Sequence, residues 1–199
     1  MKRILAAAIA AGAIAGMSQA ANATAIGYSL TISGNVNVPT YTLTNTSITA
    51  LITSFSFTVG HSGRNFDYVQ AIVAPAGGTA NLIVGDTSNG GTRTTSFQID
   101  YTGFDPSEFA SNNTDVDTGN VALDYRNTFF NNGSEPNSVI SVDFSTGQTL
   151  SQTVADQQTG QSSYTFTQRA SVVPVPAALP LMAGAIGVLG FAGWRRSRR

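Results

Sequence analysis

Short runs in which apolar residues alternate with hydroxyl-bearing residues restrict the fold of this chain more than any other feature of its sequence. Side chains at positions i and i+2 of a strand point to the same side of a sheet, so each run has one apolar and one polar face. This pattern predicts antiparallel strands with one side on a core and the other side in water. The apolar positions are Ile26, Tyr28, Leu30 and Ile32, then Tyr41 and Leu43, then Phe55, Phe57 and Val59, then Phe97, Ile99 and Tyr101, then Ile140, Val142 and Phe144, and finally Tyr164 and Phe166.

Turn signals separate these runs, and no helical period of comparable length interrupts them. Two further segments, 69–74 and 82–84, are expected to be short buried strands. The sequence therefore predicts an all-β protein that folds as an antiparallel β-sandwich. In its succession of short alternating strands and turns, the chain resembles the immunoglobulin-like or jelly-roll-like domains of bacterial surface proteins. The Gly, Pro and Asn residues that allow tight reversals gather at 60–63, 75–78, 88–91, 131–133 and 146–147.

The first 23 residues have the layout of a secretory signal peptide. Lys2 and Arg3 form a short positive region, and an apolar stretch rich in Ala, Ile and Gly follows them. Small residues come next, which is typical of the site where a signal peptidase cuts. We expect cleavage after Ala23, with Ala20 or Ala25 as alternative positions.

The C-terminal stretch combines a proline-rich segment, an apolar span and a basic end. The span, residues 177–194, is interrupted only by Pro180 and contains no charged residue. Its 18 residues are close to the lower limit for a helix that crosses the hydrocarbon layer, so we predict a transmembrane helix. The arginines that follow would stay on the cytoplasmic side under the positive-inside rule. They are Arg195, Arg196, Arg198 and Arg199.

This arrangement resembles the VPLPA-type variant of the PEP-CTERM sorting signal, which is found on exported proteins of Gram-negative bacteria. The resemblance implies that a membrane sorting enzyme of the exosortase type recognises the proline-rich motif and removes the helix. Other C-terminal signals also lose their apolar tail in the mature product. The alternative is that residues 172–199 form a permanent anchor. The motif residues are Val173, Pro174, Val175, Pro176 and Ala177.

The part of the chain between the two ends is acidic. The whole chain has a net charge of -1, but between Thr24 and Val173 four arginines stand against all eleven acidic residues, which leaves -7. Such a body repels phosphate backbones, so we expect no nucleic-acid partner. The absence of cysteine excludes thiol nucleophiles, cysteine-built zinc sites and iron–sulfur clusters. The single histidine, His61, leaves no histidine pair for a metal.

The densest acidic stretch, residues 100–124, contains the one pattern that suggests a metal. Position 6 of the EF-hand pattern lacks its glycine, position 12 holds Asp in place of Glu, and no flanking helices are expected, so we reject an EF-hand. Asp115 and Asp117 stay as candidates for a looser calcium site, and the alternative is that both are solvated surface acids. We assign no metal and no other cofactor. The residues at relative positions 1, 3, 5 and 12 are Asn113, Asp115, Asp117 and Asp124.

Two other patterns could carry chemistry. His61 and Ser62 could act as base and nucleophile, and Asp105 and Glu108 could flank a glycosidic bond as acid and base. Adjacent residues in a turn rarely face each other, and a carboxylate pair needs a separation in space that sequence does not supply. We therefore expect a surface turn and solvated loop acids, and we predict no catalytic residue.

These patterns together predict a function for the chain and a division of the chain into five parts. We expect a non-enzymatic structural or adhesive module, which the secretion machinery exports through an inner-membrane intermediate to the cell surface or extracellular matrix. Its partners, by the resemblance, are the sorting enzyme and the exopolysaccharide of a biofilm. The alternatives are a carbohydrate-binding or calcium-dependent sugar-binding domain that uses the acidic stretch, and a protein permanently anchored by its C-terminal helix. The parts are a signal peptide (1–23), a β-sandwich domain (24–168), a stalk with the proline-rich motif (169–176), a transmembrane helix (177–194) and a basic cytoplasmic tail (195–199).

Overall fold

The computed structural model describes residues 24–118, 121–130, 136–155 and 161–172. These residues belong to one compact unit, Thr24–Val172. The expected signal peptide, the proline-rich motif, the apolar span and the terminal arginines lie outside the described residues. Within the described part of the chain, no helix has the length and apolar character needed to cross a membrane.

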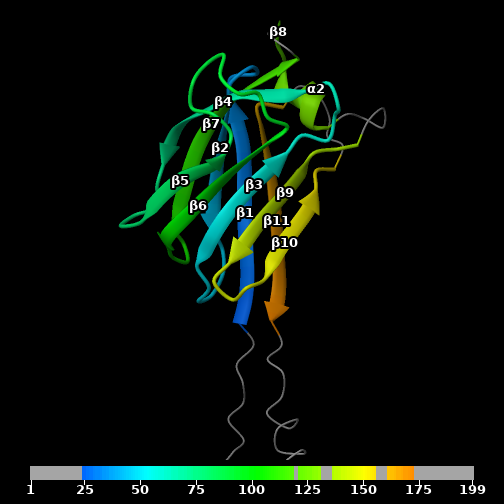
Figure 1. The fold of residues 1–199 in the computed structure, drawn as a ribbon. Helices are drawn as coiled ribbons and strands as arrows, with labels where there is room; N and C mark the ends of the chain where they lie inside the picture. Colours follow the sequence, from blue (N-terminus) through cyan, green and yellow to red (C-terminus); the bar gives the residue numbers. More distant parts are fainter. Residues whose placement is uncertain (1–23, 119–120, 131–135, 156–160, 173–199) are drawn as a thin grey trace, which may run out of the picture. The chain divides into compact units, whose positions relative to one another are not determined.

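The described strands form two antiparallel sheets in a sandwich-like arrangement (Figure 1). The first sheet contains β1 (Thr24–Gly34), β2 (Pro39–Asn45), β4 (Asn65–Val73), β7 (Phe109–Thr118), β8 (Val121–Ala122) and β11 (Ser163–Val172). The second contains β3 (Ile52–Thr58), β5 (Thr79–Val84), β6 (Ser96–Phe104), β9 (Val139–Phe144) and β10 (Thr149–Thr153). The strand orders are β11-β1-β2-β7-β4, with β8 paired to β7, and β10-β9-β3-β6-β5.

Aromatic side chains from both sheets meet in one core. The ring centroid of Tyr41 on β2 lies 5.4 Å from that of Phe57 on β3 and 5.3 Å from that of Phe97 on β6. Phe66 on β4 approaches Phe97 at 5.1 Å. All four residues are fully buried. Edge-to-face ring pairs of this kind add to the stabilisation that comes from burying apolar surface, so they hold the two sheets together.

The alternation in the sequence is confirmed, because every apolar position that it marked is buried in the core. The two segments expected to be short buried strands differ from the prediction. β4 and β5 lie at the edges of their sheets, so each has one neighbouring strand in its sheet. Val73 on β4 and Ile83 on β5 are accordingly 49% and 57% exposed, and the expectation of burial is wrong for these two residues.

The described unit begins and ends at the same pole of the first sheet (Figure 1). Thr24 pairs with Val172, and the β1–β11 register continues without a break over ten residue pairs. This pairing keeps residues 169–172 in the sheet, beyond the domain boundary that the sequence placed at 168. β2 is antiparallel to both β1 and β7, so the last residues of β7 lie at the pole opposite Thr24 and Val172.

A short helix, α2 (Tyr125–Phe129), is a feature that the sequence pattern does not predict. Asp124 is its N-cap residue and accepts a hydrogen bond from a backbone N–H of the first turn. Tyr125 and Phe129 are buried and join the aromatic core. Five residues are too few to show a helical period, and tertiary packing stabilises so short a helix. The Tyr125 N–H donates to the Val36 carbonyl at 2.8 Å, which places α2 beside the turn between β1 and β2.

Gly78, which directly precedes β5, lies too close to β6 to carry a side chain. A Cβ at this position would overlap the carbonyl oxygen of Thr102 and lie 2.8 Å from Cγ of Pro75. We expect Gly78→Ala to lower the free energy of unfolding by about 2 kcal/mol, because the backbone of β6 must move to admit the methyl group. Urea denaturation followed by circular dichroism measures the change. Gly63→Ala is the control, since its Cβ would meet His61 at 3.5 Å, and an equal cost at both glycines would contradict the close approach.

Candidate metal centre

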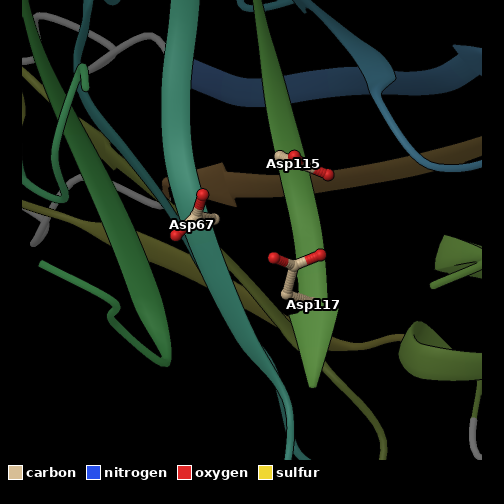
Figure 2. Close-up of side chains that lie close together, drawn as sticks. All are labelled: Asp67, Asp115 and Asp117. Atoms are coloured by element: carbon tan, nitrogen blue, oxygen red, sulfur yellow. The ribbon is translucent and has the colours of Figure 1, made fainter. Parts of the chain in front are cut away.

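Three carboxylates meet on the first sheet, towards the pole opposite Thr24 and Val172. Asp67 belongs to β4, and Asp115 and Asp117 belong to the neighbouring strand β7 (Figure 2). One carboxylate oxygen of each residue lies within 4.8 Å of those of the other two. We refer to these three residues as the acid triad.

The geometry of the two strands explains how the acid triad forms. Asp115 and Asp117 are two positions apart, so they share one side of β7, and Val116 between them is in the core. The β4–β7 register pairs Tyr68 with Asp115 and leaves Asp67 as an extra residue. In such a β-bulge two residues of one strand oppose one residue of the other, so Asp67 is held beside Asp115.

The loop between β5 and β6 supplies the partners of Asp67. Its Oδ2 accepts a hydrogen bond from the Gly90 backbone N–H at 2.9 Å, and its Oδ1 lies 3.4 Å from Nε of Arg93. Oδ1 of Asp115 and Oδ1 of Asp117 are buried and accept no hydrogen bond from any described residue. Asp117 is 5% exposed. Oδ1 of Asp67 likewise accepts no hydrogen bond from any described residue, although it has the ion pair with Arg93, so all three carboxylates of the triad have a buried oxygen without a hydrogen-bond donor.

Burial and mutual repulsion raise the pKa of two members of the triad. The pKa of Asp115 is raised by burial and then by the charges of Asp117 and Asp67. The pKa of Asp117 is raised by burial and then by Asp67, while Arg93 lowers it. The pKa of the neighbouring Tyr68 hydroxyl is raised by burial and then by the same three carboxylates. The ionised triad is therefore an electrostatically unfavourable arrangement when no further cation is near.

The structure brings together Asp115 and Asp117, the two calcium candidates of the sequence, and adds Asp67. Asp117 is buried, so it is not a solvated surface acid. Asp124, which matched the last EF-hand position, is engaged elsewhere. Its carboxylate accepts hydrogen bonds from the guanidinium and the backbone N–H of Arg126, and these bonds lower its pKa. No sequence signal marked Asp67, because an isolated Asp in a strand reveals neither a bulge nor the partner strand.

The other groups that could carry chemistry are held in local turns. Nδ1 of His61 accepts a hydrogen bond from the Gly63 N–H at 3.0 Å. Oε2 of Glu108 accepts one from the Asp105 N–H at 2.9 Å. Five of the six tyrosines are buried, so they do not line an outer face of either sheet, where an aromatic platform for a sugar would lie. They are Tyr28, Tyr41, Tyr101, Tyr125 and Tyr164.

We compared the chain with protein-family models, with curated proteins and with solved structures, and none of the three comparisons finds a match. The geometry and the ligand atoms of the acid triad themselves indicate its chemistry. Its three carboxylates are oxygen ligands of the kind that hard divalent cations bind.

Proposed function

We propose that this chain is an exported, non-enzymatic module of the cell surface or extracellular matrix, built on an immunoglobulin-like or jelly-roll-like sandwich. The observation that carries the proposal is the order of features after Val172: a proline-rich motif, an uncharged apolar span and a cluster of arginines. In this proposal the secretion machinery exports the chain and cleaves it after Ala23. An exosortase-type enzyme then cuts at the proline-rich motif, and the released domain joins the exopolysaccharide matrix.

Two features of the domain support this role. Its first and last strands pair side by side, so removal of the segments before Thr24 and after Val172 leaves the sheet whole. The outer faces also carry cross-strand hydroxyl pairs. The hydroxyls of Thr31 and Thr165 lie 3.2 Å apart, and those of Thr79 and Thr102 lie 2.7 Å apart. Such pairs stabilise a sheet and keep its surface polar without adding charge, which suits a protein that works outside the cell.

The acid triad favours a second candidate function, calcium-dependent binding of a sugar. A calcium ion takes six to eight oxygen ligands, so three carboxylates would leave positions for the hydroxyl groups of a ligand. Tyr68 is half-buried and lies beside the triad, but the other five tyrosines are buried, so the aromatic surface that a sugar could contact is small. We therefore favour the structural module over this candidate.

Intact mass measurement of the protein from cells that express it natively tests the proposed sorting. The expected mature product begins at Thr24, lacks Trp194 and Arg199, and is found outside the membrane. The loss of Trp194 is easy to follow, because it is the only tryptophan of the chain. A product that still ends at Arg199 and needs detergent for extraction would instead establish a permanent anchor.

Replacement of both motif prolines provides the matched variant. We expect Pro174→Ala combined with Pro176→Ala to leave the tail attached, so that the product keeps Trp194 and stays with the membrane fraction. Pro106→Ala, a change in a turn of the sandwich, serves as the control and should be processed like the natural chain. Normal processing of the double variant would show that the prolines are not the recognised feature.

A further inference from the structure

We propose that Asp67, Asp115 and Asp117 together bind one divalent cation, with a preference for calcium. This site goes beyond the proposed sorting and does not depend on it, since the one is tested by cation binding and the other by the mass of the product. The ion would join β4 to β7 at the pole of the sandwich opposite Thr24 and Val172.

The spacing of the carboxylates fits one shared ion. Calcium binds oxygen at about 2.3–2.6 Å, so two oxygens on opposite sides of the same ion lie about 4.6–5.2 Å apart, and adjacent ligands lie closer. In the acid triad, one oxygen of each carboxylate lies within 4.8 Å of one oxygen of each of the other two. A single calcium ion can therefore contact all three residues with small side-chain adjustments and no change of strand register.

Asp117 gives an observation that is separate from the clustering. The residue is 5% exposed, and its Oδ1 is buried with no hydrogen-bond donor among the described residues. A buried ionised carboxylate costs free energy unless a partner compensates its charge. The Arg93 guanidinium forms its ion pair with Asp67 and acts on Asp117 only at longer range, so it compensates the charge of Asp117 in part. A cation bound between the two strands would supply the missing partner of Asp117.

The charges of the site also fit a divalent ion. Three ionised carboxylates and the Arg93 guanidinium leave a net charge of about -2 on these four side chains, which one divalent cation neutralises. Tyr68 and Asn65 lie opposite Asp115 and Asp117 in the register, so their side chains share the face that carries the triad.

Calcium fits these residues better than other common metals. The three side chains in the cluster all offer oxygen, whereas zinc and copper sites in proteins usually include nitrogen or sulfur ligands. Magnesium demands near-ideal octahedral geometry at about 2.0–2.1 Å. Calcium tolerates irregular geometry and completes its shell with water, which suits three carboxylates set by a β-bulge.

Calorimetric titration of the full-length protein with CaCl2, after removal of divalent ions with EDTA, is the direct test. We expect one site per chain with a dissociation constant on the order of 10⁻⁴ M, as in extracellular calcium modules. At 10 mM CaCl2 the melting temperature should rise by roughly 5 °C, because the ion binds the folded state alone. MgCl2 at the same concentration should give a smaller rise.

Luminescence of bound terbium provides a second test, which reports whether the ion lies close to Tyr68. Tb³⁺ commonly replaces calcium and emits when a nearby tyrosine is excited, and Tyr68 lies beside the triad. We expect tyrosine-excited emission from TbCl3 with the natural chain and competition by CaCl2. Tyr68→Phe should remove most of this emission while calcium binding measured by calorimetry stays within about two-fold, since a phenyl ring keeps the packing.

Variants that change one charge distinguish calcium binding at the triad from attraction of calcium to the overall negative charge of the domain. Asp117→Asn and Asp115→Asn should each weaken calcium binding at least about ten-fold, because each removes one charged ligand. Arg93→Met should strengthen it about five-fold, because a competing positive charge is gone. Asp100→Asn is the matched control on β6 of the other sheet, where Oδ1 accepts a bond from Gln98, and it should change nothing.

Several outcomes would overturn the proposal. They are the absence of calcium binding up to 10 mM with the natural chain, equal losses from Asp100→Asn and Asp117→Asn, or weaker binding by Arg93→Met. Tighter binding of magnesium than of calcium would overturn the stated preference. The opposite signs expected for Asp117→Asn and Arg93→Met keep the test decisive even where one variant folds poorly.

Discussion

Replacement of Phe57 by alanine is expected to lower the free energy of unfolding by about 4 kcal/mol, the range measured for buried phenylalanines in well-packed cores. The ring of Phe57 is fully buried. Its centroid lies 5.4 Å from that of Tyr41, 6.1 Å from Phe66, 6.2 Å from Phe97 and 4.7 Å from Phe129. These neighbours come from β2, β4, β6 and α2, so a cavity at Phe57 removes contacts with both sheets and with the helix. Urea denaturation followed by circular dichroism measures the loss.

Phe109→Ala is the matched control for this prediction. The same atoms are deleted, but Phe109 at the start of β7 is 59% exposed. Its removal should change the free energy of unfolding by no more than about 0.5 kcal/mol, as is usual for surface positions. If both substitutions lowered the free energy of unfolding equally, the contacts of Phe57 in the core would not explain its loss. Phe57→Leu should fall between them, since the smaller side chain fills part of the cavity.

Replacement of Asn45 by aspartate should cost about 3 kcal/mol, although the two side chains have nearly the same shape. Asn45 is fully buried at the end of β2. Its Nδ2 donates to the carbonyls of Ala50 and Phe104, both at 2.9 Å, and its Oδ1 accepts from the Ser47 N–H at 3.0 Å. A carboxylate would set a charged oxygen against two carbonyl oxygens and lose both donated bonds. The destabilisation is again measured by urea denaturation.

The pH dependence of the Asn45→Asp variant gives a check on mechanism. The folded site disfavours the charged form of the introduced carboxyl, so its pKa is raised on folding. Between the ordinary Asp pKa and the raised folded-state pKa the unfolded state binds fewer protons than the folded state, so the cost is smallest below the ordinary Asp pKa, grows as pH rises, and is full only above the folded-state pKa. The difference from the natural chain should therefore shrink between pH 7 and pH 4. Asn35→Asp, at an exposed turn position where the side-chain oxygen accepts a hydrogen bond from the Asn37 N–H, should show neither the cost nor this pH dependence.

The sequence predicted the core faces of the strands because a period of two decides which side chains share a side. It did not predict which strands would be edges, since the pairing of β4 and β5 depends on contacts between residues far apart in the chain. Separation along the chain also explains why the sequence did not identify Asn45 as a buried residue that bonds to other segments. Its position on the apolar side of β2 follows from the alternation, but its carbonyl partners lie in other segments.

The residues of the acid triad could likewise be predicted only in part from the sequence. Asp115 and Asp117 were found together because their spacing places them on one side of one strand. Asp67 comes from a different strand and from a β-bulge, and neither is encoded by a local pattern. Helix α2 was missed for a different reason, because its five residues make little more than one turn and cannot show a repeated apolar spacing.

The ladder between β1 and β11 determines how the domain would carry a mechanical load. Its hydrogen bonds run perpendicular to the strands, and it pairs ten residues on each strand. A tension between the acid triad and Val172 crosses the sheet obliquely, because β1 and β2 lie between β7 and β11, and its main component is parallel to the strands. All the bonds of the ladder then share this force in shear, and they must fail together. A force that pulled Thr24 and Val172 apart would instead open the ladder one bond at a time. The domain is therefore built to resist traction between its far pole and its C-terminal side, and to yield easily when its two ends are separated.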